Sequence, residues 1–461
     1  MHNIRTIVQI EVLKMEKGRS LFQLAFPIFI ESMLFMLLGV ADIFMLSQYS
    51  DKAAGAVGAA NQLIGNINLI FVIISAGTAV LVAQSVGAKR IDDVERVSSV
   101  SLLMNLIVGL TISSIMFFFG NPILIKIGVT PDLMAHASDY IKIVGGGLFI
   151  QAVLNTVTAI IRSYGYTRES MIITVIMNIV NIIGDAIFIF GFFGMPVLGV
   201  KGVAIATTFS RALATILVLV FMFKRVLSIK MFSRLVERPI SAFVNLFKIG
   251  FPSAMENMSY NLAQTVLMSI ILLNLGESAQ ITRTYVLTII RLVSIFSIAI
   301  GQGSQIMIGQ MIGAGKIEEA YRTGLRNFRV AMVCSITASF IMALFSRNLI
   351  GIYTKDQEIV KMAVIVLIID AFLEPGRTFN IVLINSLRGT GDVIFPVIMA
   401  VISMWGVSVL FGYIFGVVLG FGLPGVWIAT LLDEWIRGVS MLYRWKSRKW
   451  QKKISANTKT Q

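Results

Sequence analysis

The chain contains few of the side chains that usually bind metals or act as nucleophiles. It has one cysteine, Cys334, and two histidines, His2 and His136, among its 461 residues. A single cysteine excludes an intramolecular disulfide and a thiolate metal cluster. Both histidines lie outside the hydrophobic segments, so a histidine-based metal site is not expected. We therefore expect a protein that is not an enzyme and that needs neither a metal nor an organic cofactor.

Charged side chains are also scarce. They make up 14% of the residues, whereas soluble domains contain about a quarter. Hydrophobic residues account for 56%, and apolar stretches long enough to cross a hydrocarbon core of about 30 Å recur along the chain. The sequence predicts an all-α polytopic membrane protein with roughly twelve transmembrane helices. These stretches are centred near residues 33, 67, 108, 148, 181, 212, 258, 292, 334, 370, 404 and 430.

The net charge of +15 is compatible with binding to nucleic acid or to a membrane surface. Lys and Arg, however, gather in alternate loops, as the positive-inside rule describes for cytoplasmic segments. This distribution predicts a multi-pass protein of the plasma membrane with both termini in the cytoplasm. It also predicts contact with anionic lipid rather than with nucleic acid.

The two halves of the chain repeat one another at a spacing of about 225 residues. Pro27 and Glu31 recur as Pro252 and Glu256, and three further blocks follow in the same order. Six spans in each half keep both copies in one orientation, which predicts two six-helix lobes related by a pseudo-two-fold axis along the membrane normal. This organisation is usual for secondary transporters. The other blocks pair Gln84–Ala88 with Gln310–Ala314, Arg162–Gly165 with Arg388–Gly391, and Gly202–Thr207 with Gly425–Thr430.

The same patterns divide the chain into five segments. The first segment has acidic residues and no long apolar core, so it is expected to be an interfacial helix rather than a signal peptide. The linker between the lobes is basic and amphipathic, and the tail is basic and then polar. The predicted segments are an interfacial segment 1–19, an N-lobe 20–223 (helices 1–6), a cytoplasmic linker 224–240, a C-lobe 241–445 (helices 7–12) and a disordered tail 446–461.

Several predicted spans contain ionisable groups, each of which costs on the order of 2.5–3.5 kcal/mol inside a bilayer and so needs a partner or a function. In the first span, Glu31 and Asp42 lie on nearly the same helical face. In the fifth span, Asn178, Asn181 and Asp185 follow one stripe. The second half has comparable stripes, namely Glu256, Asn257, Tyr260, Asn261 and Gln264 in the seventh span and Asp370, Glu374 and Arg377 in the tenth.

The repeat separates these groups into two kinds. Glu31 and Glu256 occupy equivalent positions, so they serve either the packing of each lobe or a cavity mouth common to both. Asn178, Tyr260 and Asn261 are further candidates to line a substrate cavity or a gate. For Glu374 and Arg377, a structural ion pair is as good an interpretation as contact with substrate.

Two carboxylates occur in the first half only, because the positions equivalent to Asp42 and Asp185 hold Leu267 and Phe411. Two acids held together away from water retain a proton between them near neutral pH. We therefore predict that this pair couples transport to protons or another cation. The alternative is that each acid only hydrogen-bonds a neighbouring helix. The expected hydrogen-bonding partners are Asn155, Asn181 and a threonine of the sixth span, Thr208 or its neighbour Thr207.

Pro27 and Pro252 lie in the first span of each half. Because proline removes a backbone hydrogen bond and bends a helix, matched prolines suggest matched hinges. A proline in the first turn of each helix would have no such consequence. We favour the hinge.

With these residues the chain resembles the multidrug and toxic compound extrusion (MATE) family of cation-coupled antiporters over residues 15 to 445. The resemblance implies two six-helix lobes, a central cavity, and export of hydrophobic, often cationic compounds against protons or sodium. It implies a polar cluster in the N-lobe at Asp42, Asn155, Asn181, Asp185 and the threonine. The matching motifs are Phe26-Pro27 followed by Asp42, Gln84–Ala88, Asn181 with Asp185 and Phe190-Gly191, and Leu387–Asp392.

The chain departs from the sodium-linked branch of this family in its second half. Tyr260 stands where that branch has a glutamate, and Arg377 stands where it has an aspartate, with Glu374 one turn earlier. The coupling ion, H⁺ or Na⁺, is therefore left open. We expect a monomeric multidrug exporter of small organic molecules; the alternative is a lipid-linked oligosaccharide flippase of the same superfamily.

Overall fold

The computed structural model describes residues 20–236 and 239–452. The predicted interfacial segment 1–19 lies outside these residues. Within the described ranges the chain is helical and contains no strand. It divides into two compact units, Met1–Phe251 and Pro252–Gln461, and the boundary falls at Pro252 inside one long helix.

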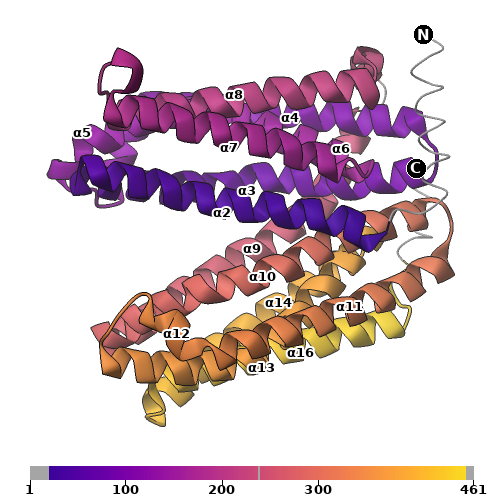
Figure 1. Cartoon of the computed structure of the whole chain (residues 1–461). Coiled ribbons are helices and arrows are strands. Elements are labelled where there is room, and N and C mark those ends of the chain that lie inside the picture. Colours follow the sequence, from indigo (N-terminus) through magenta and orange to yellow (C-terminus); the bar gives the residue numbers. More distant parts are fainter. Residues whose placement is uncertain (1–19, 237–238, 453–461) are drawn as a thin grey trace. The chain divides into compact units, whose positions relative to one another are not determined.

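The first lobe is a bundle of long helices (Figure 1). A short π-helical turn, η1, interrupts its fourth span, and a 3₁₀ segment, η3, follows the sixth. The elements are α2 (Leu21–Tyr49), α3 (Asp51–Gly87), α4 (Ile91–Lys126), α5 (Pro131–Tyr140), η1 (Ile141–Gly145), α6 (Leu148–Ser163), α7 (Thr167–Phe190), η2 (Phe192–Gly194), α8 (Val200–Arg225) and η3 (Ile229–Val236).

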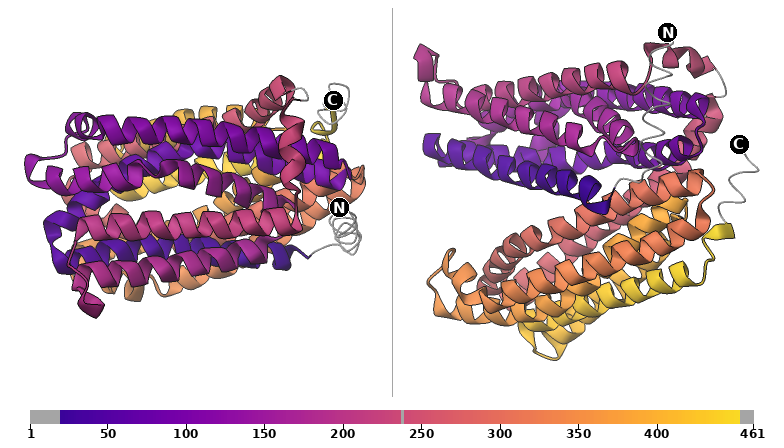
Figure 2. Two further views of the ribbon diagram at one scale, coloured as in Figure 1. Left: turned by 90° about the horizontal axis from the view of Figure 1, so that it is seen from above. Right: turned by 45° about the vertical axis from the view of Figure 1, so that its right-hand side comes forward.

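The second lobe repeats this order, and Figure 2 shows its helices from two further sides. Two π-helical turns interrupt its fifth span. The elements are α9 (Pro239–Leu275), α10 (Glu277–Gly313), α11 (Ile317–Leu344), α12 (Ser346–Gly351), α13 (Gln357–Thr390), α14 (Ile394–Ser403), η4 (Met404–Val409), α15 (Leu410–Tyr413), η5 (Ile414–Val418) and α16 (Gly422–Lys446).

The predicted set of twelve spans is confirmed. Nine helical segments of the described chain are long and apolar enough to cross a membrane, and α5 with α6 forms a tenth span that bends by 45°. The remaining two are α13 and α16, which carry several charged residues each. Those two spans are nevertheless recognisable from the repeat, because they occupy the places of α5–α6 and α8.

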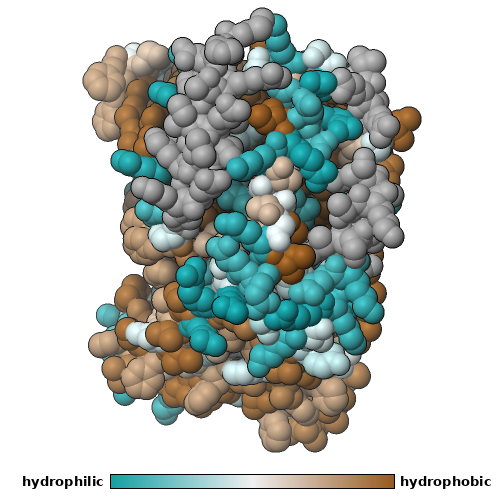
Figure 3. All heavy atoms as spheres, turned by 90° about the vertical axis from the view of Figure 1, so that its right-hand side faces the viewer, coloured by the Kyte–Doolittle hydropathy of each residue, from teal (hydrophilic) through white to brown (hydrophobic). Residues whose placement is uncertain are grey.

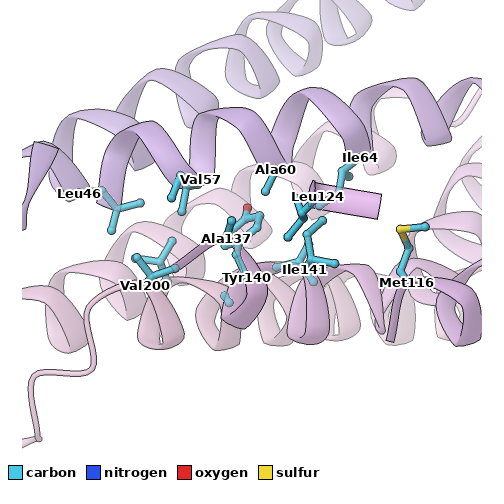
Figure 4. Close-up of a cluster of buried hydrophobic side chains, with 14 of the residues drawn as sticks. Leu46, Val57, Ala60, Ile64, Met116, Leu124, Ala137, Tyr140, Ile141 and Val200 are labelled. Carbon is cyan, nitrogen blue, oxygen red and sulfur yellow. The ribbon is translucent and has the colours of Figure 1, made fainter. Parts of the chain in front are cut away.

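The lobes also share their helix pairings. In the first lobe α3 packs on α4 and α6, and α6 packs on α4 and α8. The equivalent helices of the second lobe pair in the same way, since α10 contacts α11 and α13, and α13 contacts α11 and α16. Figure 4 shows part of the first core, to which α2, α3, α4, α5 and α8 contribute buried side chains. The repeat in the sequence is therefore a repeat in structure.

The glycines of the repeated Arg-x-x-Gly blocks have a local role. Gly165 ends the turn after α6 and Gly391 ends α13, and both have φ of 88°. This left-handed conformation strains any residue with a Cβ atom. The residue that follows this glycine, Tyr166 or Asp392, contacts the last long helix of its lobe, and the kind of contact differs between the lobes.

In the first lobe, Tyr166 packs edge-on against Phe221 of α8 with ring centroids 5.2 Å apart. In the second lobe, the equivalent residue Asp392 accepts a hydrogen bond from Arg444 Nε of α16 at 2.7 Å. An aromatic contact in one lobe thus corresponds to an ion pair in the other.

The linker after α8 packs on its own lobe. Met231 is fully buried, and its carbonyl accepts a hydrogen bond from Ser99 Oγ of α4 at 2.8 Å. Arg234 donates to Asp92 at 2.8 Å. The predicted linker 224–240 therefore contains a docked segment rather than a free connector.

The start of the tail predicted to be disordered, 446–461, is packed instead. Trp450 is fully buried and stacks on Trp445 with ring centroids 4.9 Å apart. Its Nε1 donates to the Trp445 carbonyl at 3.0 Å. A tryptophan can bury its ring on the end of a helix while its N–H finds a free carbonyl, which outweighs the polar composition around it. Residues 453–461 lie outside the described part.

The outer surface fits a membrane protein. In Figure 3, hydrophilic side chains gather over the helix ends that face the viewer, and hydrophobic ones cover the flanks. Many large apolar side chains on the helix flanks are exposed, such as Phe118 and Phe340. Such flanks are stable only against lipid.

Candidate functional site

The two unmatched carboxylates of the first lobe lie together. α2 and α7 pack side by side, and the carboxyl groups of Asp42 and Asp185 are close enough to interact with one another. Asp42 is 6% exposed and Asp185 is fully buried. A hydrogen bond between two carboxyl groups requires a proton on one of them, because ionised carboxylates only accept. The arrangement is therefore suited to holding one shared proton.

Few other groups donate hydrogen bonds to this pair. Among the described residues, no donor outside the pair reaches either oxygen of Asp185 or Oδ1 of Asp42. The side-chain amide of Asn178 and the Oδ1 atom of Asn181 are also buried without hydrogen bonds. Each unsatisfied buried polar group costs on the order of 1–3 kcal/mol. We call these four side chains the acid-pair cluster. Its unsatisfied donors and acceptors can bind a further polar or charged species.

Tyr140 lies near this cluster, although the sequence pattern did not single it out. It is almost fully buried, donates a hydrogen bond to Asn61 Oδ1 at 3.0 Å, and lies in electrostatic range of both acids. Tyr140 immediately precedes η1, and π-helical turns are frequent at functional sites. The only signal in the sequence is the run of three glycines at residues 145–147 that follows this turn.

The threonine of the cluster is Thr207 rather than Thr208. Asn181 Nδ2 donates to Thr207 Oγ1 at 3.4 Å, whereas Thr208 Oγ1 donates to the carbonyl of Ala204 within its own helix. Consecutive residues on a helix point about 100° apart, so only one of the two can face α7. The predicted partner Asn155 accepts a hydrogen bond from Gln151 at 2.7 Å, and no bond joins it to the acids among the described residues.

The repeated glutamates bind the repeated arginines of their own lobes. Glu31 is buried and forms an ion pair with Arg162, and it also accepts hydrogen bonds from Ser170 and Thr174 at 3.1 Å each. Glu256 forms an ion pair with Arg388 at 2.8 Å. This geometry supports the packing interpretation of these two glutamates over the gating one.

The prolines lie inside their helices. Pro27 lies beyond the first turn of α2, which begins at Leu21, and Pro252 lies well inside α9. The interpretation of both as first-turn prolines is therefore excluded by the helix boundaries. A role as hinges stays a prediction, and the boundary between the two compact units at Pro252 supports it.

A charged cluster occupies the second lobe. Arg377 Nη1 donates to Glu374 Oε2 at 2.5 Å, and Ser294 of α10 donates to the other oxygen of Glu374 at 2.8 Å. Asp370 is fully buried and accepts a hydrogen bond from Trp427 Nε1 at 3.0 Å. Glu374 and Arg377 thus form an ion pair, which agrees with the structural interpretation of these two residues.

This cluster continues on α16 through residues that sequence patterns did not identify. Arg437 forms ion pairs with Asp433 at 2.8 Å and with Glu434 at 2.9 Å. Glu434 lies 3.7 Å from Arg377 Nε. The sequence did contain a signal for this cluster, because one predicted span carries three charged side chains, Asp433, Glu434 and Arg437.

The remaining predicted residues of the second lobe lie on α9. Tyr260 is partly exposed and lies in electrostatic range of Arg377 and Glu434, so it lies at the edge of that cluster. Asn261 is exposed on the adjacent face. In the described part of the chain, no group of three or more His, Cys, Asp or Glu side chains has the geometry to hold a metal ion.

Twelve spans in two repeated lobes, with buried ionisable clusters inside each, define a multi-pass membrane transporter. The sequence model of the family described as MatE matches residues 27–187 and 252–414. The chain belongs to this family of transporters, and it is not an enzyme. The resemblance found from its motifs is thereby confirmed.

Individual relatives agree with this assignment. The chain is 42% identical to an uncharacterized transporter, YisQ, of Bacillus subtilis, over 95% of this chain and 96% of the relative. It is 27% identical to a probable multidrug resistance protein, NorM, of Thermotoga maritima, over 95% of this chain and 94% of that one.

Solved structures share the fold. A crystal structure of MATE in the bent conformation aligns with a TM-score of 0.84 at 22% identity, covering 98% of both chains. An outward-facing multidrug resistance transporter of the family aligns with a TM-score of 0.82 at 22% identity, covering 95% of both chains. At this level of identity the likeness concerns the fold alone.

Proposed function

We propose that this protein is a secondary active multidrug exporter. It moves hydrophobic or cationic organic compounds out of the cell in exchange for protons or sodium ions, by alternating access. The observation that carries the proposal is the buried proximity of Asp42 and Asp185, because Oδ1 of Asp42 and both oxygens of Asp185 have no hydrogen-bond donor outside the pair among the described residues. Several relatives are named as probable multidrug resistance proteins, which supports this class of substrate.

The acid pair converts ion binding into movement of α2 against α7. With one proton between them, Asp42 and Asp185 attract each other and hold the two helices together. Without it, two like charges in a medium of low dielectric repel each other and require a positive partner. Because Pro27 lacks the N–H that would fix the preceding turn of α2, the helix can bend there in response.

The contact between two carboxyl groups favours the proton over sodium as the coupling ion. A proton is shared between two carboxyl oxygens, whereas a sodium ion would be coordinated by several oxygens at once and would separate them. The amides of Asn178 and Asn181 would then stabilise the deprotonated pair by donating hydrogen bonds.

The test is transport into everted membrane vesicles driven by an imposed pH gradient or an imposed sodium gradient. We expect export of a cationic dye driven by the pH gradient, and a loss of at least tenfold in rate for Asp42→Asn and Asp185→Asn. Asp132→Asn is the matched control, because Asp132 is exposed and forms an ion pair with the exposed Lys52. Full transport by both variants of the pair would contradict the proposal.

The flippase alternative has a separate readout. Membership of the MatE family favours the exporter, and a flippase would move a fluorescent lipid-linked oligosaccharide across the bilayer of proteoliposomes without dye export.

We further propose that both termini face the cytoplasm, that basic loops contact anionic lipid, and that the protein works as a monomer in the plasma membrane. Labelling of single cysteines introduced near residues 20 and 450 from either side of the membrane tests the orientation.

A further inference from the structure

We propose that Arg211 is a tethered counter-ion of the acid-pair cluster, and that cationic substrates compete with it. The inference rests on the proposed function and adds a specificity-determining residue to it. In this view the guanidinium neutralises Asp42 and Asp185 whenever the pair has lost its proton and no substrate is bound. A substrate with a positive charge then has to displace it.

The position of Arg211 on α8 supports this role. Arg211 lies one helical turn beyond Thr207, which faces Asn181 of α7, so its side chain leaves the helix on nearly the same side. Arg211 is half-buried, and it interacts electrostatically with Asp42 and with Tyr140. Among the described residues, no ion pair engages its guanidinium, so it is available to the acid pair.

The repeat provides independent support. The matched blocks that begin at Gly202 and Gly425 make Arg211 equivalent to Glu434 of α16. Glu434 lies inside the charged cluster of its own lobe, 2.9 Å from Arg437 and 3.0 Å from Asn380. The same position of the last helix thus carries a charged side chain beside a buried ionisable cluster in each lobe.

The chemistry of the two partners is complementary. Oδ1 of Asp42 and both oxygens of Asp185 have unused acceptor capacity. A guanidinium stays charged at every accessible pH and can donate two parallel hydrogen bonds to a carboxylate. Among the described residues, Arg211 of α8 interacts electrostatically with Asp42, and Tyr140 of α5 interacts with both acids. Tyr140 is neutral, so Arg211 supplies the fixed positive charge.

Two consequences follow. An arginine beside a carboxyl pair favours the deprotonated state, so removing the arginine lets the pair keep its proton to higher pH. The arginine also repels a cationic substrate and leaves a neutral one unaffected. Both effects depend on charge and not on the shape of the side chain, which separates them from a packing role.

The experiment compares Arg211→Met, Arg211→Gln and Arg211→Lys with the wild-type protein in everted vesicles, across a pH series, with one cationic and one neutral dye. For the Met and Gln variants we expect the pH at which transport falls to half its maximum to rise by roughly one to three units. We expect the KM for the cationic dye to fall about tenfold, while the KM for the neutral dye stays unchanged. The Lys variant should keep both wild-type properties. Arg291→Met, at an exposed arginine of α10, is the matched control.

A second measurement does not depend on transport. The purified protein is titrated while the infrared band of its protonated carboxyl groups is followed, and Asp185→Asn identifies the part of the band that belongs to the pair. Removal of Arg211 should move this part of the titration to higher pH by the same one to three units. An unchanged titration in folded Met and Gln variants, with an unchanged KM for the cationic dye, would overturn the inference. Absence of gradient-driven transport by the wild-type protein would instead overturn the proposed function, and the infrared titration would still decide the role of Arg211.

Discussion

Replacing Glu31 with Gln tests whether the repeated glutamates hold their lobes together. The side chain of Glu31 is 3% exposed and binds Arg162, Ser170 and Thr174. Removing one partner of a buried ion pair typically costs about 3–5 kcal/mol, because the other charge stays buried. The side chain of Glu256 is 11% exposed and has Arg388 as its charged partner. Glu256→Gln should therefore destabilise its lobe by a smaller amount.

The measurement is denaturation of the purified protein in detergent, followed by tryptophan fluorescence and by helical circular dichroism. Glu31→Gln, Arg162→Gln and the double variant form a thermodynamic cycle that isolates the energy of this pair. We expect a coupling energy of about 1.5–3 kcal/mol, with transport per folded molecule close to wild type. A coupling energy near zero, or a normal stability with lost transport, would refute the packing interpretation and restore the gating one.

Three further substitutions test local features of the fold. Trp427→Phe removes the N–H that binds Asp370, and it should destabilise the second lobe by about 1–3 kcal/mol, because a buried carboxyl group then loses its donor; thermal unfolding checks this, and an unchanged midpoint would contradict it. Gly165→Ala and Gly391→Ala each place a Cβ atom on a residue with φ of 88°, and each should cost about 1 kcal/mol or more; Gly39→Ala, where the added atom meets nothing within 4 Å, is the control for both.

The fold was predictable from the sequence because hydropathy and repetition act over whole segments. Twelve apolar stretches and four repeated blocks are long signals, and the spans α13 and α16 stayed recognisable despite their charges. The acid pair was predictable for another reason: Asp42 and Asp185 are costly in a bilayer and have no equivalent in the second half. The structure then placed them against each other.

Contacts between helices were harder to predict. Thr207 and Thr208 differ by one residue, and only the rotation of α8 against α7 decides which one meets Asn181. Tyr140 lies in electrostatic range of the acid pair, but the only nearby sequence signal is the run of glycines at 145–147 after the π-helical turn. The cluster on α16 depends on residues more than fifty positions away from Arg377, and such distant contacts leave no local periodicity.

At one repeated contact, the ring pair of Tyr166 and Phe221 in the first lobe is replaced by Asp392 and Arg444 in the second. Loss of one ring leaves a gap that neighbouring side chains can partly fill. Loss of Arg444 leaves the carboxylate of Asp392, whose side chain is only 1% exposed, without its charged partner. The second lobe should therefore tolerate fewer amino-acid changes at this contact than the first, although both lobes have the same order of helices.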